Sequence, residues 1–78
     1  MRVIYSAGAS KDLRKLPSKD QEQIVLKLDI YAATGAGDVK KLKARIGYRL
    51  RHGVWRANFV IEGDVIVVSI LHRSTAYQ

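Results

Sequence analysis

The chain has 78 residues, of which 47% are hydrophobic, and this predicts one small folded domain over residues 1–78 with a core of modest size. It has no cysteine, which excludes disulfide bonds and cysteine-based metal sites, and no signal peptide or apolar run long enough to span a membrane, so we expect a cytoplasmic protein. Its formal net charge of +7 favours a polyanionic partner, either a nucleic acid or an acidic protein.

The first 16 residues predict a short strand followed by a short helix. Residues 2–6 carry β-branched and aromatic side chains, which is typical of a strand, and Ser6 is suited to cap the helix after it. The apolar residues of that helix recur at helical spacing, and Lys11 and Asp12 are expected to face away from them. The predicted apolar positions are Ala9, Leu13 and Leu16.

A second helix is predicted after Pro17, which ends the first one. Ser18 and Gln21 fit a capping box at its start, and Gly35 provides a stop signal at its end. Its apolar face consists of Ile24, Leu28 and Tyr31, with Val25 and Ala32 beside it. Very few residues join the two helices, so we expect an antiparallel helical hairpin.

The C-terminal half predicts an antiparallel meander. Residues 38–46 form a basic connector, after which the hydrophobic period changes to two. His52–Gly53 is the expected turn between the first two strands, and Gly63–Asp64 is the expected turn before the last strand, residues 65–71. The predicted fold class is therefore α+β: an N-terminal strand, a two-helix hairpin packed on one sheet face, and a three-stranded antiparallel meander.

The predicted hairpin register gathers three arginines on one face of the sheet. A turn at His52–Gly53 puts Arg49 opposite Arg56, and strand alternation puts Arg51 on the same face. Like charges at facing positions destabilise a sheet, so the cluster favours phosphate binding over a solvated surface kept for solubility. The same interpretation makes four preceding residues general contacts to an RNA backbone: Lys40, Lys41, Lys43 and Arg45.

The register also divides the apolar residues between the two faces. The core face, against the helices, is predicted to hold Tyr48, Leu50, Trp55, Ala57, Phe59, Ile61, Ile66, Val68 and Ile70. The outer face is predicted to hold Val60, Val65, Val67 and Leu71 beside the arginines. An apolar patch next to a basic one on an exposed sheet face predicts a protein partner.

The tail beyond the last strand carries residues suited to acid–base chemistry. His72 and Tyr77 can exchange protons, and Arg73 can stabilise an anion, although such residues near a terminus more often serve as caps. With two histidines and no acidic cluster, neither a metal site nor a cofactor is expected. A nuclease of this kind would use the ribose 2′-hydroxyl as nucleophile, which only RNA offers.

Several of these segments together resemble the RelE/ParE toxin superfamily of bacterial toxin–antitoxin systems. The segments are Lys41-Leu42-Lys43, Gly47-Tyr48-Arg49-Leu50-Arg51, Gly53-Val54-Trp55-Arg56 and the tail His72-Arg73 with Tyr77. The resemblance implies a RelE-like fold and cleavage of mRNA on the ribosome without metal, by 2′-hydroxyl attack, which inhibits translation. It also implies a cognate antitoxin as partner, through which the complex binds operator DNA.

The resemblance gives the site residues individual roles. Arg49 and Arg51 match a basic pair, Arg56 matches an arginine that contacts the scissile phosphate, and Tyr77 matches a C-terminal tyrosine. His72 and Arg73 match the basic residues of the tail. Several relatives have lysines where this chain has Arg49 and Arg51, and arginine is a poor base, so the base is Tyr77 or His72.

Two other functions fit the same resemblance. One is a ParE-like inhibitor of DNA gyrase without ribonuclease activity. The other is a catalytically silent member that retains antitoxin binding.

Overall fold

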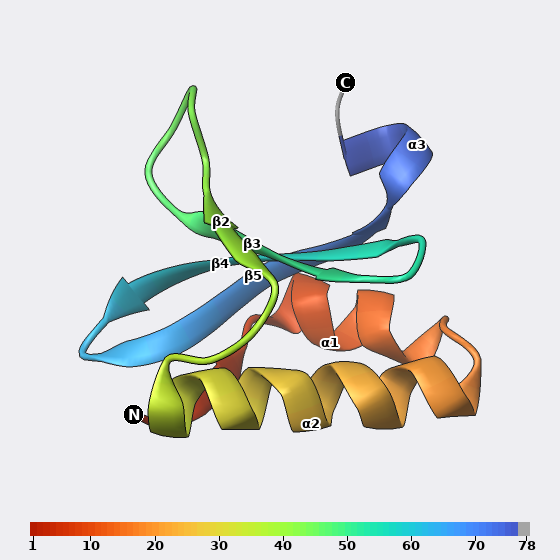
Figure 1. The fold of residues 1–78 in the computed structure, drawn as a ribbon. Helices are drawn as coiled ribbons and strands as arrows, with labels where there is room; N and C mark the ends of the chain where they lie inside the picture. Colours follow the sequence, from red (N-terminus) through yellow and green to blue (C-terminus); the bar gives the residue numbers. More distant parts are fainter. Residues whose placement is uncertain (77–78) are drawn as a thin grey trace.

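The computed structural model describes residues 1–76 and contains, within them, five strands and three helices (Figure 1). In chain order these are β1 (Val3–Tyr5), α1 (Ala7–Arg14), α2 (Ser18–Thr34), β2 (Val39–Lys41), β3 (Tyr48–His52), β4 (Trp55–Glu62), β5 (Asp64–His72) and α3 (Arg73–Ala76). The predicted α+β order is confirmed. The sheet is larger than predicted, because β2 forms inside the basic connector and β1 joins β5 in parallel.

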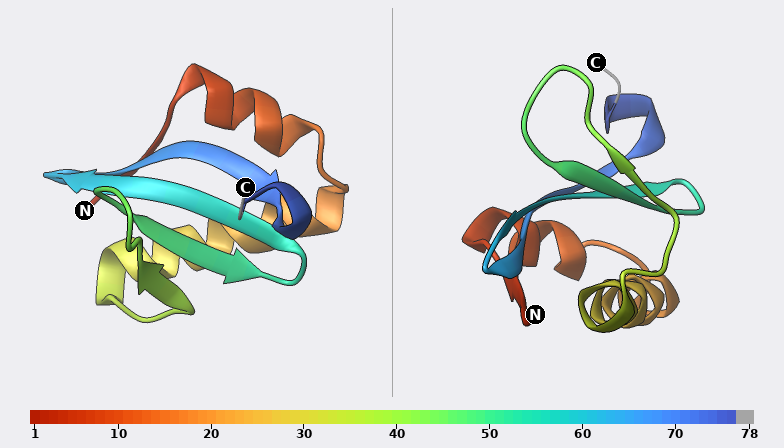
Figure 2. Two further views of the ribbon diagram at one scale, coloured as in Figure 1. Left: turned by 90° about the horizontal axis from the view of Figure 1, so that it is seen from above. Right: turned by 60° about the vertical axis from the view of Figure 1, so that its left-hand side comes forward.

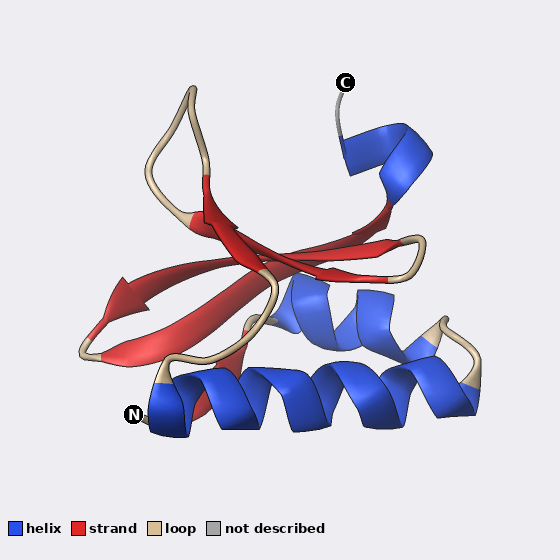
Figure 3. Cartoon of the chain, in the orientation of Figure 1, coloured by secondary structure: helices blue, strands red, loops and turns tan. Residues whose placement is uncertain are grey.

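The strands form one mixed sheet in the order β1-β5-β4-β3-β2, with different elements on its two faces. Helices α1 and α2 run in opposite directions along one face, as predicted (Figures 1 and 3). Helix α3 and the loop between β2 and β3 rise from the other face, which we call the outer face (Figure 2). The outer face is therefore bordered on two sides and open between them.

The first helix is capped and anchored by its own polar side chains. Ser6 Oγ accepts a hydrogen bond from the Ala9 backbone N–H at 3.0 Å, as predicted. Asp12 does not face away as expected, because its Oδ2 accepts the backbone N–H of Ile70 at 3.0 Å. β1 pairs with β5 only as far as Val67, so the backbone N–H of Ile70 has no partner on β1. The Asp12 carboxylate supplies the acceptor for that N–H.

The predicted capping box of the second helix is wrong. α2 begins at Ser18 with Pro17 in the cap position, and no side chain bonds to the cap. Gln21 Nε2 instead donates to the Leu16 carbonyl at 2.7 Å, so it ties α2 to the end of the preceding turn. Gly35 closes the helix as predicted, at φ 77°, where its N–H reaches the Tyr31 carbonyl.

The turn between β3 and β4 is shifted by one residue from the prediction. Its central residues are Gly53 and Val54, so Arg51 faces Arg56, and Arg49 faces Asn58. Gly53 has φ 54° and Val54 does not have a positive φ, which is the pattern of a type II′ turn with glycine in its first central position. The shift changes each strand partner by two residues, so the predicted faces of β3 and β4 are retained.

The predicted faces of β5 are partly wrong, for two reasons. Glu62 pairs with Asp64 across Gly63, which reverses the predicted alternation of the residues that follow. Val68 is then left unpaired in a bulge, because Asn58 pairs with Ser69 and Phe59 with Val67, and the bulge restores the predicted alternation. As a result Val65 and Val67 are buried in the core, Val68 is 44% exposed on the outer side, and Ile66 is half-buried there.

The core lies between the sheet and the two long helices. Its buried residues are Ala9, Leu16, Ile24, Leu28, Ala32, Leu50, Ala57, Phe59, Val65, Val67 and Ile70. Tyr48 and Trp55 pack against this core, as predicted, and the Tyr48 ring stacks on Phe59 at a centroid distance of 5.5 Å. Ile61, also predicted to be buried, is 39% exposed near the turn that ends β4.

His52 links the sheet to α2. Its Nδ1 lies 2.8 Å from Lys27 Nζ and its Nε2 lies 3.1 Å from Asp20 Oδ1. A lysine ammonium can only donate, so Nδ1 accepts and Nε2 carries the proton that is donated to Asp20. His52 is therefore a strand residue held by the helical layer, and not the turn residue that was predicted.

Candidate functional site

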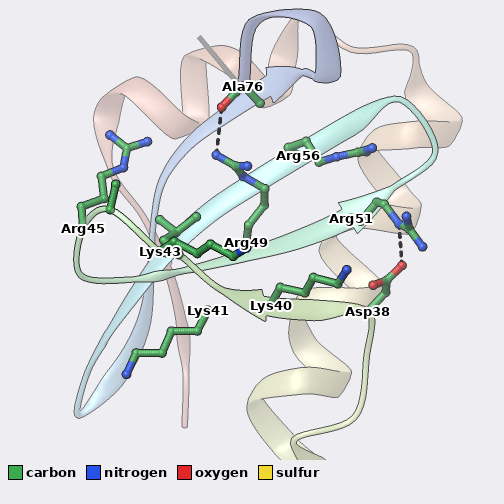
Figure 4. Close-up of a pocket in the computed structure, with 11 residues that line it drawn as sticks. Asp38, Lys40, Lys41, Lys43, Arg45, Arg49, Arg51, Arg56 and Ala76 are labelled. Carbon is green, nitrogen blue, oxygen red and sulfur yellow. Dashed lines mark hydrogen bonds and ion pairs between the residues drawn. The ribbon is translucent and has the colours of Figure 1, made fainter.

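An open pocket of about 700 Å³ lies on the outer face of the sheet (Figure 4). Its lining residues are Asp38, Lys40, Lys41, Leu42, Lys43, Ala44, Arg45, Arg49, Arg51, Arg56 and Ala76. Seven of them are lysine or arginine and one is acidic, which gives a formal charge of +6. We call this feature the basic pocket. It brings together the seven lysines and arginines outside the tail that were predicted to bind RNA or its scissile phosphate.

Hydrogen bonds to two partners hold Arg49 at the centre of the basic pocket. Its Nε donates to Asn58 Oδ1 at 3.0 Å, and its Nη2 donates to the Ala76 carbonyl at 2.9 Å (Figure 4). Asn58 is its facing residue on β4, and Ala76 is in α3. Arg49 thus connects the sheet to the C-terminal helix.

Arg51 and Arg56 face each other across β3 and β4, and each guanidinium donates to different hydrogen-bond acceptors. Arg51 Nε donates to Asp38 Oδ2 at 2.7 Å, in an ion pair whose two side chains are 58% and 46% exposed. Arg56 is only 6% exposed, and its Nη1 donates to the carbonyls of Gly53 at 2.7 Å and Trp55 at 2.9 Å. Like charges were predicted to face each other at Arg49 and Arg56, but the facing pair is Arg51 and Arg56. The bonds to Asp38 and to the two backbone carbonyls offset the repulsion between them.

The four basic residues before β3 do not all point the same way. Lys40 pairs with Arg49, so its side chain lies on the outer face, and Lys43 reaches from the loop towards Arg49 (Figure 4). Arg45 stands on the loop at the edge of the basic pocket. Lys41 pairs with Tyr48, whose side chain packs on the core face, and in Figure 4 Lys41 is directed away from the arginines.

The basic residues of the tail lie outside the basic pocket. His72 pairs with Trp55, so it belongs to the core face, and its ring meets the Trp55 ring edge-on at a centroid distance of 5.5 Å. The Ser74 backbone N–H donates to His72 Nδ1 at 3.2 Å. Neither His72 nor Arg73 lines the basic pocket. Tyr77, the third predicted residue of the tail, lies outside the described residues.

Within residues 1–76 no three histidine or acidic side chains are grouped so that they could hold a metal ion. None of the helices in that range is both long enough and apolar enough to cross a membrane.

An apolar strip runs beside the basic pocket on the outer face. Ile4, Ile66 and Val60 are register partners across β1, β5 and β4, and Val68 bulges out next to them. Ile46, in the loop between β2 and β3, is 90% exposed. The predicted outer patch is thus confirmed in position, but two of its predicted members, Val65 and Val67, are replaced by Ile66 and Val68.

Sequence reasoning missed three groups that organise the basic pocket: Asp38, Asn58 and the carbonyl of Ala76. Asp38 accepts from both the side chain and the backbone N–H of Arg51. Asn58 is a polar residue at an outward position of a largely apolar strand, and it is 3% exposed. With the turn at Gly53–Val54 it falls opposite Arg49, so the correct register would have identified it.

The family model described as the ParE toxin of the type II toxin–antitoxin system parDE matches residues 3–77. No curated protein matches the chain.

The fold is similar to several solved toxin structures. In the RelB–RelE antitoxin–toxin complex from Methanococcus jannaschii, a chain with 26% identity aligns over 95% of this chain and 94% of its own length, with a TM-score of 0.78. The archaeal RelE–RelB complex from Pyrococcus horikoshii OT3 gives 23% identity, 95% and 96% coverage and a TM-score of 0.77. The intact E. coli RelBE complex gives 26% identity, 88% and 92% coverage and a TM-score of 0.60.

Proposed function

The chain belongs to the ParE toxin family of type II toxin–antitoxin systems, and it shares its fold with chains of solved RelB–RelE complexes. We propose that it is a metal-independent endoribonuclease that cleaves mRNA on the ribosome and so inhibits translation. The observation that carries the proposal is the basic pocket, with its charge of +6 on a sheet face bordered by a loop and a helix. A concave cationic surface of this kind suits a polyanionic backbone with its phosphates. The solved RelE chains, which share the fold, add support.

In the proposed reaction the ribose 2′-hydroxyl attacks the adjacent phosphorus, and the bond to the leaving 5′-oxygen breaks. Arg56 and Arg51 supply positive charge to the phosphorane, on which negative charge develops. Lys40, Lys43 and Arg45 hold the flanking backbone. Since His72 belongs to the core face, we assign the role of proton acceptor to Tyr77, on the basis of its match to the C-terminal tyrosine in the sequence.

The partner that we propose is a cognate antitoxin bound to the apolar strip of the outer face. Ile46 and Val68 are exposed there, and the basic pocket lies directly beside them. A segment with apolar side chains and acidic neighbours complements both surfaces. An occupant of the strip would also cover the pocket, which is how one binding event blocks RNA. Operator DNA would be contacted by the antitoxin of this complex.

A second function is favoured by one observation. Among the described residues that line the basic pocket there is no histidine or tyrosine, and the one carboxylate, Asp38, already binds Arg51 through its Oδ2. A pocket of this composition suits binding without cleavage, as expected of a ParE-like inhibitor of DNA gyrase or of a silent member that binds only its antitoxin.

The proposed function is tested by inducing the chain in bacteria and mapping the 5′ ends of cellular RNA. We expect new 5′ ends inside translated codons, and we expect them to vanish when ribosomes are cleared from the message. Intact mRNA together with inhibition of gyrase supercoiling by the purified chain would instead establish the second function. Intact mRNA with unaffected gyrase would leave the antitoxin-binding role.

The cations at the rim should contribute to RNA affinity mainly through counterion release. We expect the variant with Lys40, Lys43 and Arg45 all replaced by alanine to reduce the slope of log K against log salt for single-stranded RNA by about 2, since each lost contact contributes about 0.7. Fluorescence anisotropy with a labelled RNA measures the slope. Lys41→Ala is the matched comparison. The Lys41 side chain points away from the arginines, so its loss should change the slope by less than the value of about 0.7 for one contact. A triple variant with the wild-type slope would contradict the assignment.

A further inference from the structure

Arg49, Asn58 and Ser69 form a row of hydrogen-bonded side chains across three strands. They are register partners on β3, β4 and β5, and they share the outer face. Arg49 Nε donates to Asn58 Oδ1 at 3.0 Å, and Asn58 Nδ2 donates to Ser69 Oγ at 3.1 Å. The row exists because the bulge at Val68 brings Ser69, and not Val68, opposite Asn58.

The chemistry of the row sets the orientation of the Asn58 amide. A guanidinium has donors and no acceptor, so the amide oxygen must face Arg49 and the amide nitrogen must face Ser69. Asn58 is 3% exposed. Burial of an asparagine side chain destabilises the folded state unless its polar atoms form hydrogen bonds. Both of its polar groups are bonded here, so its amide plane is held firmly.

The row continues from the sheet into the C-terminal helix. With Nε bound to Asn58, Arg49 presents Nη2 to the Ala76 carbonyl at 2.9 Å (Figure 4). Ala76 is 6% exposed and is the last residue of α3, directly before Tyr77 in the sequence. The rotamer of Arg49 therefore affects where the end of α3 stands relative to the basic pocket.

We propose that Asn58 is a positioning residue that fixes Arg49, and that Arg49 in turn docks the end of α3 at the basic pocket. Asn58 does not touch the RNA. The effect on cleavage rests on the proposed ribonuclease function, whereas the positioning of Arg49 and α3 does not. This gives Arg49 a second role beside the phosphate contact expected from its sequence: it holds the end of α3 at Ala76.

The positioning is tested without any activity measurement, by NMR of the ¹⁵N-labelled chain. The Arg49 Nε–H signal, assigned by its loss in Arg49→Lys, should exchange slowly with water in the wild type. In Asn58→Leu, which is nearly isosteric, we expect this exchange and that of the amides of residues 73–76 to become at least about tenfold faster, because an acceptor of a charged donor is lost. Asn58→Asp keeps an acceptor and should keep the slow exchange. Unchanged exchange in a folded Asn58→Leu would overturn the proposal.

The consequence for cleavage is tested with a double-mutant cycle. We expect Asn58→Leu to lower the cleavage rate by about tenfold, the effect of one hydrogen bond to a charged group, and to have no further effect in the Arg49→Ala background. Effects that multiply independently would show that Asn58 does not act through Arg49 and would overturn the proposal. A wild-type chain that cleaves no RNA would refute the proposed function, and the exchange measurement would still decide the positioning.

Discussion

Arg56→Ala is expected to lower the rate of RNA cleavage by at least about a hundredfold, which is the usual effect of removing one preorganised donor from a site that stabilises developing charge. Arg56 suits this role because it is 6% exposed and two backbone carbonyls of the turn hold its guanidinium. A charge that is fixed and shielded from water acts more strongly on a phosphorane than an exposed one. RNA affinity should change much less than the rate, since six other lysine and arginine residues line the basic pocket.

The same substitution should also destabilise the fold, because it removes the bonds from Arg56 to the carbonyls of Gly53 and Trp55. We expect the free energy of unfolding to fall by about 1–3 kcal/mol. Cleavage must therefore be compared at a temperature at which circular dichroism shows both proteins folded. Arg14→Ala is the control: it removes the same charge from α1, on the opposite side of the sheet, and should leave cleavage within about twofold of wild type. A folded Arg56→Ala that cleaves at the wild-type rate would exclude this role.

The faces of β3 and β4 could be predicted from the sequence because side-chain alternation depends only on parity. Moving the turn from His52–Gly53 to Gly53–Val54 changed the partner of Arg49 from Arg56 to Asn58, but it left all three arginines on the outer face. Register is less predictable, since Gly53 could adopt a positive φ in either central position of a two-residue turn, and the glycine alone therefore does not fix the register. The composition of the basic pocket was therefore predictable, and its internal pairing was not.

The errors on β5 have a different physical origin. The turn at Gly63 reverses the predicted alternation, and the bulge at Val68 restores it. Nothing in the apolar run of residues 65–71 marks Val68 as the unpaired position. In such a run either alternation buries valine or isoleucine equally well, so hydrophobicity cannot choose between them. β2 was missed because two of its three residues are lysines at the edge of the sheet, and a lysine-rich segment without apolar alternation is typical of a loop.

The tail shows the limit of reasoning from residue types. His72 was placed with the arginines because it follows the strand next to Arg56, but its partner across the sheet is Trp55, which packs against the core. The side chain of a residue at the end of a strand can lie on either face of the sheet. The predicted alternation that puts Ile70 on the core face would have put His72 there too, but the last strand was expected to end at residue 71, whereas β5 extends to His72.

Gly47→Ala is expected to cause a large loss of stability, about 2–4 kcal/mol, from backbone strain together with a steric clash. Gly47 has φ 129°, in the region that side chains rarely adopt, and a Cβ there would stand 2.9 Å from the Phe59 carbonyl oxygen. That oxygen belongs to the backbone of the central strand β4, so it cannot move aside as a flexible side chain would. Urea denaturation followed by far-UV circular dichroism measures the loss.

A functional loss should accompany the loss of stability, since Gly47 closes the loop that carries Lys43 and Arg45. Its carbonyl accepts the N–H of Leu42 at 2.9 Å, which joins the two ends of the loop. Gly63→Ala is the matched control: Gly63 has φ 74°, with nothing within 4 Å of an added Cβ, so its cost should be only the local strain of about 1–2 kcal/mol. Equal losses for the two variants would show that strain alone acts at Gly47. A larger loss for Gly47→Ala, with weaker RNA binding by the folded fraction, would show that its close contact with β4 sets the position of the cationic loop.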